Sequence, residues 1–501
     1  MSTPIQHVFV LMLENRSFDH MLGFSGISGT DAATGQPTSI NGLTGTESNL
    51  HAGRQYPVTQ PAWYTMPADP PHELTDVLEQ LCGVGATYPP GGAYPPINHS
   101  GFVDSFAALN VGDPGLIMGA FSPGQLPVLN ALAREFAVCD NWYASMPGPT
   151  WPNRFFVHAA SSNGLDHSPT TAEIVLWESL QGFDFAAGTI FDRMNSHNVR
   201  WRLYAGDDFP MIAALKGIQL NLVHPYRDFA NDVAAADYGV AYTFIEPSYN
   251  VLSDYKCSTS QHPLDDVTRG ELLIAATYHA IRTSPLWDSS MLIVTWDEHG
   301  GFYDHAAPPA AVAPGDSHPG GDHNQFGFTF ERYGVRVPAV IASPWIPRNL
   351  VDHRLYDHTS ILATAEAAFS IPPMTKRDAA ANNLLPLASL AAPRTDAPLD
   401  LGVPAVSGAP ECPPLDFVTA AAPPSNTPPP VARPDEPVNE GNIAGVLHSA
   451  LRSDLALSPP ASRGKILSQF SAIKTRGQAR QYADTVRQKL RAAQPSGPLG
   501  A

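Results

Sequence analysis

The sequence predicts a layered α/β fold, in which helices cover both faces of a sheet of buried strands. Three observations predict it. Short apolar runs rich in β-branched and aromatic residues recur along residues 5–370, and helical patterns alternate with them. Hydrophobic residues make up 43% of a chain of 501, which supports a sizeable core.

Five apolar runs are the predicted strands of this sheet. Each is nearly continuous rather than alternating, as is typical of strands that are covered on both faces. The runs are HVFVLML (7–13), VRWRLYA (199–205), YTFIEP (242–247), MLIVTW (291–296) and RVPAVIAS (336–343).

Helical patterns lie between the strands. The segment 268–284 has apolar residues at i, i+3, i+4 spacing, and the segment 357–370 opens with Asp and Thr, which are capping residues. A further helix is predicted after Pro149, with Thr150 as its N-cap and Pro152 in its first turn. This alternation indicates βαβ units.

Composition divides the chain into three parts. Residues 1–420 form the predicted α/β domain, and within it residues 25–120 are rich in Gly, Pro, Ser and Thr, which predicts long loop excursions over the sheet. Residues 421–441 are a Pro-rich spacer. Residues 442–501 are a helical basic tail, either docked on the acidic body, the favoured interpretation, or used to bind a partner.

Charge and apolar content exclude several classes of protein. The net charge of -18 opposes binding to nucleic acid or to an anionic membrane surface. No apolar run is long enough for an integral membrane span. The four cysteines show no zinc-binding spacing, and the first strand leaves no room for a signal peptide, so a cytoplasmic location is expected from the chain as written.

Acidic residues follow two of the predicted strands. Glu14 and Asn15 end the first strand, and Asp297 and Glu298 end the strand 291–296. Ligands of α/β sheets collect outside the carboxyl ends of the strands, so these side chains are expected to converge. Three carboxylates and an amide oxygen suit one divalent metal ion: Mg²⁺, Ca²⁺ or Mn²⁺, or Zn²⁺ or Fe if a histidine joins. The alternative is that the acids cap strand ends.

Thr150 and several loop histidines complete the candidate site. A hydroxyl at a helix N-terminus lies beside free backbone N–H groups, which bind anions, although Thr is also an ordinary N-cap. The histidines in polar loops suit proton transfer or phosphate contact. They are His72, His262, His299, His305 and His358.

Seven motifs together resemble a known family. They read HVFVLMLENRSFDHMLGF, DPPHE, MPGPTWPNRFFVHAA, QHPLDDVTRGE, TWDEHGGFYDHAAPP, GVRVPAVIASPW and DHTS, in this order over about residues 5–370. The chain resembles the bacterial phosphoesterase family of phosphatidylcholine-type phospholipases C and a related acid phosphatase, whose members have an alkaline-phosphatase-like fold. It departs from the secreted members in its Pro-rich spacer and helical tail.

The resemblance implies roles for individual residues. Glu14, Asn15, Thr150, Asp297 and Glu298 match the family's ligands to a single metal ion, and Thr150 matches its nucleophile, which is Thr in the phospholipase branch. His72 and His262 match histidines that contact the phosphoryl group, and both are expected to be protonated. Asn15 and His358 are further expected substrate contacts.

The predicted function is hydrolysis of a phosphoric ester, most specifically by a phospholipase C type phosphodiesterase with a phospho-threonine intermediate on Thr150. A broad-specificity acid phosphatase is the alternative, and a catalytically silent binding protein is a distant one. The substrate would be a phosphate ester or phospholipid, and two segments, 61–67 and 112–121, would either touch a bilayer or pack on the body. The sequence leaves the oligomeric state open.

Overall fold

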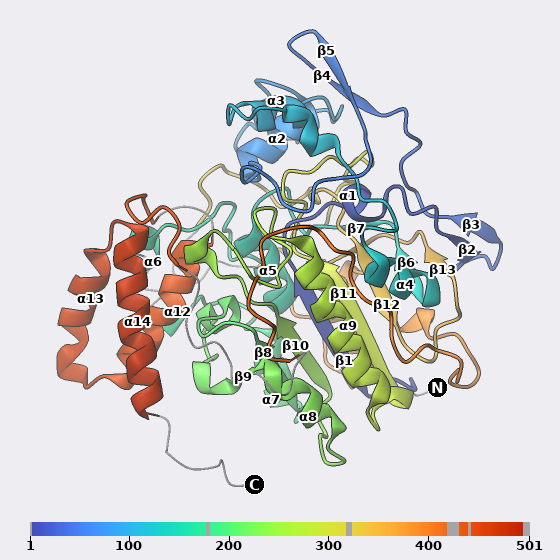
Figure 1. Cartoon of the computed structure of the whole chain (residues 1–501). Helices are drawn as coiled ribbons and strands as arrows, with labels where there is room; N and C mark the ends of the chain where they lie inside the picture. The colour runs from blue at the N-terminus through green and yellow to red at the C-terminus, as the bar shows by residue number, and fades with distance from the viewer. Residues whose placement is uncertain (1–2, 177–180, 317–322, 418–429, 439–441, 494–501) are drawn as a thin grey trace.

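The central sheet of the computed structural model has ten strands in the order β3-β2-β13-β6-β12-β11-β1-β10-β8-β9 (Figure 1). The structure describes residues 3–176, 181–316, 323–417, 430–438 and 442–493. The strands of the sheet are β1 (His7–Leu13), β2 (Ser28–Asp31), β3 (Pro37–Ser39), β6 (Ala137–Cys139), β8 (Trp201–Ala205), β9 (Val223–Pro225), β10 (Tyr242–Glu246), β11 (Ser290–Trp296), β12 (Ala339–Ala342) and β13 (Leu350–Asp352). Two small pairs accompany it, β4 (Ser48–His51) with β5 (Arg54–Pro57), and β7 (Trp142–Tyr143) with β14 (Tyr356–Asp357).

The five predicted strands are confirmed, and they lie side by side as β12-β11-β1-β10-β8. All seven residues of β11 are buried, as the continuous apolar run predicts. β1, β8, β10 and β11 are parallel, whereas β12 is antiparallel to β11. No helix lies between β11 and β12 in the described part of that connection, so the chain can return in the opposite direction without a crossover.

Helices cover both faces of the sheet, which confirms the predicted α/β class. On one face α4 (Pro127–Glu135), α8 (Phe229–Ala234) and α9 (Val267–Thr283) pack together, and α9 lies in front of β1 and β11 in Figure 1. The other layer contains α5 (Thr150–Ala159), α7 (Ile190–Ser196) and α10 (Thr359–Phe369). The chain passes α7 on its way from β6 to β8 and returns across the sheet to β11 through α8 and α9, and right-handed crossovers in the two directions account for the two layers. The body also contains the short α-helices α1 (Phe18–Leu22), α6 (Thr171–Leu176) and α11 (Lys376–Ala380).

Two predicted helix caps are wrong. Thr150 is the first residue of α5, and the N-cap is Pro149. His358, rather than Asp357 or Thr359, is the N-cap of α10. In both cases the backbone turns into the helix one residue away from the residue that capping preferences select.

The excursion over residues 25–120 has more structure than its loop-like composition predicts. Its strands β2 and β3 extend the sheet, and α2 (Leu74–Cys82) and α3 (Phe102–Ala107) pack on a separate apolar cluster that includes Phe302. Figure 1 shows α2, α3 and the β4–β5 hairpin gathered at one end of the molecule. This cap covers the end of the sheet at which β1 leads into α1.

Three C-terminal helices pack against the body: α12 (Ile443–Leu457), α13 (Arg463–Ser471) and α14 (Arg476–Ala493). They stand together at one side of the molecule, in red in Figure 1. Much of the predicted spacer, residues 421–441, lies outside the described residues, which include 430–438 of it. None of the helices in the described part of the chain is long and apolar enough to cross a bilayer.

A disulfide joins Cys257 to Cys412, 155 residues apart, while Cys82 and Cys139 are free. Four cysteines without regular spacing gave no indication of this pairing. The bond fixes the segment before the spacer to a loop that follows β10.

We expect Cys412→Ser to lower the midpoint of thermal unfolding, since loss of a native disulfide costs about 2–5 kcal/mol. Calorimetry with and without dithiothreitol checks this, with Cys82→Ser as the matched control. Dithiothreitol should lower the wild-type midpoint and leave that of Cys412→Ser unchanged; equal midpoints for wild type and Cys412→Ser would contradict the expectation.

Candidate active site

The two acidic strand ends lie next to each other. β1 and β11 are neighbours with Leu13 opposite Trp296, so Glu14 and Asn15 leave the sheet beside Asp297 and Glu298. The backbone N–H of Asn15 donates to Asp297 Oδ1 at 3.0 Å. The predicted convergence at the carboxyl ends of the strands is therefore present.

Asn15 connects these acids to Thr150. Its Nδ2 donates to Thr150 Oγ1 at 3.1 Å and also to Glu298 Oε1. Its backbone has a φ of +53°, an uncommon conformation that asparagine tolerates better than most residues. One amide group thus holds the hydroxyl at the start of α5 beside a carboxylate at the end of β11.

The loop after β11 approaches this asparagine closely, and Gly300 makes the approach possible. Gly300 has a φ of +63°, and a Cβ on it would lie 2.2 Å from the carbonyl oxygen of Asn15. Its N–H donates to Glu298 Oε2 at 2.7 Å, which fixes the orientation of that carboxylate. A side chain at residue 300 would therefore push the loop off the site.

The site buries more negative than positive charge. Arg154 Nε donates to Asp297 Oδ2 at 2.9 Å, and Arg154 Nη1 lies 3.7 Å from Glu246 Oε1, at the end of β10. Burial raises the pKa of Glu14 well above its usual value, as does the charge of Asp297. Burial likewise raises the pKa of Glu246 to about 7, in spite of Arg154. One arginine does not balance these carboxylates.

Four buried polar atoms of the site have no hydrogen-bond partner among the described residues. Three are the oxygen atoms Glu14 Oε2, Asn15 Oδ1 and Glu246 Oε2, and the fourth is Arg154 Nη1. Oxygen atoms without partners, in a site with excess negative charge, fit a divalent cation, because buried charges are normally paired or bind metals. The predicted ligands therefore suit the metal ion that the family resemblance implies.

Asp297 fits this ligand set less directly. Its Oδ1 accepts from the N–H groups of Asn15 and Glu298, and its Oδ2 accepts from Arg154. A group of His, Cys, Asp and Glu side chains elsewhere in the protein can also hold a metal ion. Over the described residues, only Asp19, Asp304 and His305 bring three possible ligand atoms within 4.8 Å of one another.

That second acidic group lies at the start of α1 and is already neutralised. Arg336 Nη2 lies 3.0 Å from Asp19 Oδ1, and Arg336 Nε lies 2.8 Å from Asp304 Oδ1. His305 Nδ1 lies 2.6 Å from Asp19 Oδ2. His305 is therefore engaged in this ion-pair network.

His72 lies beside the carboxylate of Glu298. Its Nε2 is 3.9 Å from Glu298 Oε1, and its Nδ1 donates to the carbonyl oxygen of Pro70 at 2.7 Å. Burial lowers the pKa of His72, but the carboxylates of Glu298, Asp69 and Glu73 outweigh burial and raise it to about 10. A protonated His72, as expected from the sequence, agrees with this environment.

His262 lies in surroundings that oppose its expected protonation. Its ring stacks on Tyr255 with 3.3 Å between ring centroids, and its Nδ1 accepts from the N–H of Leu264 at 3.3 Å. Burial lowers the pKa of His262 well below its usual value, and the positive charges of His72 and Arg16 lower it further. Its Nε2 lies 3.4 Å from Asp69 Oδ1.

His358 does not have a ring nitrogen free for substrate, contrary to expectation. Its Nε2 donates to the carbonyl oxygen of Asp297 at 2.6 Å, and its Nδ1 accepts from Trp142 Nε1 at 3.3 Å. Burial lowers its pKa to about 4. His358 therefore supports the end of β11 as a neutral ring.

His299 faces the cap. Its Nε2 lies 2.8 Å from Gln80 Oε1 on α2, and its Nδ1 lies 3.3 Å from Glu298 Oε2. The loop after β11 is thereby joined to the excursion.

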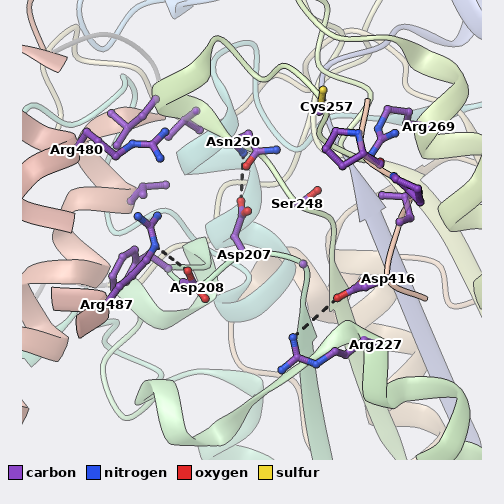
Figure 2. Close-up of a pocket in the computed structure, with 18 of the residues that line it drawn as sticks. Asp207, Asp208, Arg227, Ser248, Asn250, Cys257, Arg269, Asp416, Arg480 and Arg487 are labelled. Carbon is purple, nitrogen blue, oxygen red and sulfur yellow. Dashed lines mark hydrogen bonds and ion pairs between the residues drawn. The ribbon is translucent and has the colours of Figure 1, made fainter. Parts of the chain in front are cut away.

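A separate cavity of about 290 Å³ lies between α14 and the carboxyl ends of β8 and β10. Figure 2 shows Arg480 and Arg487 of α14 on one side of it, and Ser248, Asn250 and Cys257 on the other. None of the described residues that line it is a predicted site residue. The cavity therefore lies at the interface between the C-terminal helices and the body.

Sequence reasoning missed three residues of the site. Glu246 ends the predicted strand 242–247 just as Glu14 ends the first strand, so its position was a usable signal. Arg154 lies four residues after Thr150 on one helix face, which was also a usable signal. Asn442 donates to Glu14 Oε1 at 2.6 Å across 428 residues, and no local pattern indicates this contact.

The chain is similar to known proteins over most of its length. The model of the Phosphoesterase family matches residues 5–372. Non-specific phospholipase C6 of Arabidopsis thaliana is 35% identical over 417 residues, which cover 80% of this chain and 75% of that protein. Phospholipase C B of Mycobacterium tuberculosis is 28% identical over 486 residues, which cover 87% of this chain and 88% of that protein.

A solved structure of a protein in the alkaline phosphatase superfamily, from Vibrio parahaemolyticus, aligns with a TM-score of 0.31 and 15% identity, over 55% of this chain and 65% of that chain. The α/β class follows from the sheet described above. The residues that the family model matches, 5–372, nearly coincide with the region of the predicted resemblance, about residues 5–370. The chain belongs to the Phosphoesterase family and is a hydrolase that acts on phosphoric esters.

Proposed function

We propose that the chain is a metal-dependent phosphodiesterase of phospholipase C type with Thr150 as its nucleophile. The observation that carries the proposal is the pair of bonds from Asn15 to Thr150 Oγ1 and to Glu298. These bonds hold the Thr150 hydroxyl, at the N-terminus of α5, among buried carboxylates. Glu14 Oε2 in this group has no hydrogen-bond partner among the described residues.

Glu14, Asn15, Thr150 and Glu298, with Asp297 behind them, would hold the metal ion. When bound, such an ion lowers the pKa of a coordinated hydroxyl and offsets the buried negative charge. The metal's identity stays open among Mg²⁺, Ca²⁺, Mn²⁺, Zn²⁺ and Fe, because the oxygen ligands do not single out one of them.

The chain's own groups account for the two chemical steps. The Thr150 hydroxyl gives its proton to solvent and Oγ1 attacks phosphorus; a new P–O bond forms as the P–O bond to the alcohol breaks. Protonated His72 gives its proton to the departing oxygen. Water then attacks the phospho-threonine and neutral His72 takes a proton from this water. The P–O bond to Thr150 breaks, and the Thr150 oxygen takes up a proton from solvent. Backbone N–H groups at the start of α5 bind the anionic oxygens throughout.

An exposed tryptophan supports a lipid substrate. Trp63 is 56% exposed, and its neighbour Tyr64 accepts at its carbonyl from the N–H of Val267, next to the loop of His262. An exposed tryptophan suits a membrane interface. In the other candidate segment, Ile117 and Met118 are buried, so that segment packs on the body.

The disulfide supports an oxidising compartment. Disulfides persist mainly outside the cytoplasm, so Cys257–Cys412 favours export over the cytoplasmic location expected from the sequence. Counting free thiols in protein from its native source tests this: two are expected for export, Cys82 and Cys139, and four would favour the cytoplasm.

We expect Thr150→Ala to lower turnover of bis(p-nitrophenyl) phosphate by roughly 10³-fold or more, because the attacking oxygen is lost. Thr150→Ser keeps a hydroxyl and is the matched control. The wild type should hydrolyse this diester faster than p-nitrophenyl phosphate; the reverse order favours the acid phosphatase alternative. If a folded Thr150→Ala hydrolysed the esters no more slowly than the wild type, hydrolysis would not depend on Thr150. The catalytically silent binding protein would then be the remaining hypothesis.

The effect of His72→Ala should depend on the leaving group. An alkoxide leaving group needs a proton, so hydrolysis of phosphatidylcholine should fall by about 10²–10⁴-fold. p-Nitrophenolate leaves without a proton, so the nitrophenyl diester should be affected much less. An equal loss with both substrates would argue that His72 acts by positioning alone.

Metal binding at the predicted ligands can be measured without turnover. We expect Mn²⁺ to raise the unfolding midpoint of the EDTA-treated wild type, since a ligand at 100 times its Kd stabilises by about 2.7 kcal/mol. Glu14→Gln should lose most of this rise, and Asp304→Asn should keep it. The opposite result would place the ion at the group of Asp19, Asp304 and His305.

A further inference from the structure

We propose that the C-terminal helices complete the active site and that Asn442 is a positioning residue for Glu14. The inference rests on the proposed function, because it concerns a ligand of the proposed metal ion. It concerns the part of the chain after residue 372, which the family match does not include.

Asn442 contacts both Glu14 and Tyr255. Its Nδ2 donates to Glu14 Oε1 at 2.6 Å and lies 3.3 Å from the hydroxyl oxygen of Tyr255. Tyr255 in turn stacks on His262. The amide is buried, and it leaves only Glu14 Oε2 without a partner. Asn442 therefore fixes which carboxylate oxygen of Glu14 is available to an ion.

Close packing places Asn442 there. Asn442 precedes α12, and a Cβ at Gly445 in the first turn of α12 would lie 1.6 Å from the ring of Trp151. Trp151 follows Thr150 in α5. The start of α12 thus lies directly against the start of the helix that presents the nucleophile.

The C-terminal part of the chain also holds the loop that carries Tyr255. Several consecutive residues of this loop are bonded to residues from 412 onward. The contacts are Ala432 N to Leu252 O at 3.1 Å, Arg480 Nη2 to Ser253 Oγ at 3.0 Å, Arg433 Nη2 to Asp254 Oδ1 at 2.9 Å, an ion pair of Arg476 with Asp254, the Asn442–Tyr255 bond, and the Cys412–Cys257 disulfide.

The loop needs such support, because its backbone is in an unfavourable conformation. Asn250, Asp254, Tyr255 and Cys257 have φ values of +51°, +50°, +61° and +60°. Residues other than glycine rarely adopt this region. Figure 2 shows Arg480 and Arg487 facing this loop across the cavity, and Arg487 pairs with Asp208 at 2.7 Å.

The test uses the full chain with Asn442→Ala and Asn442→Leu, which both remove the donor, while Leu also keeps the volume. Asn231→Ala is the matched control, since Asn231 is exposed on α8. Mn²⁺ affinity is measured by calorimetry on the EDTA-treated proteins, and kcat and KM are measured with bis(p-nitrophenyl) phosphate.

Both Asn442 variants should bind Mn²⁺ about 10–100-fold more weakly, as is typical when a group that orients a metal ligand is lost. Their kcat should fall, KM should change little, and excess Mn²⁺ should restore part of kcat. A role in stability alone would lower the unfolding midpoint and leave Mn²⁺ affinity and kcat of the folded enzyme unchanged.

If wild type is active and either folded Asn442 variant matches Asn231→Ala in Mn²⁺ affinity and kcat, the inference is overturned and the proposed function stands. A folded wild type that hydrolyses none of the esters with any of the candidate metals would overturn the proposed function.

Discussion

The rest of the site depends on buried negative charge at the ends of neighbouring strands. Glu14 and Asp297 follow adjacent strands, and Glu246 ends the strand on the other side of β1. In a low-dielectric interior such groups repel one another unless cations compensate them. Arg154 compensates part of the charge, and the remainder creates a demand for a cation. The hydroxyl of Thr150 is held beside this charge by the amide of Asn15, so the same constraint that calls for an ion also places the nucleophile next to it.

How far the sequence predicts the structure depends on the range of the interaction. The five central strands follow from apolar runs, because burial on both faces leaves a continuous pattern in each segment. The neighbouring positions of Glu14 and Asp297 follow from strand polarity. The short strand β6 and the antiparallel direction of β12 leave no such pattern. The environment of His262 was not predicted, because burial and the positive charges of His72 and Arg16, which come from other parts of the chain, lower its pKa.

The C-terminal helices show most clearly that contacts between distant parts of the chain are not predictable from local sequence. Their helical periodicity is visible in the sequence, and so is their positive charge, which docks on aspartates such as Asp208 and Asp254. The contact that matters to the site is a single amide, Asn442, and asparagine at a helix start is unremarkable in sequence. Surface charge brings the helices to the body, whereas the fit of Gly445 on Trp151 sets where α12 begins.

The bond between Glu14 and Asn442 has a consequence for synthesis of the protein on the ribosome. Glu14 is translated 428 residues before Asn442. The sheet around β1 can form while the chain is still emerging, because domains generally fold as units during synthesis. The carboxylate of Glu14 gains the amide of Asn442 only after the start of α12 has left the exit tunnel. Nascent chains therefore carry an unfinished centre until the C-terminal helices emerge.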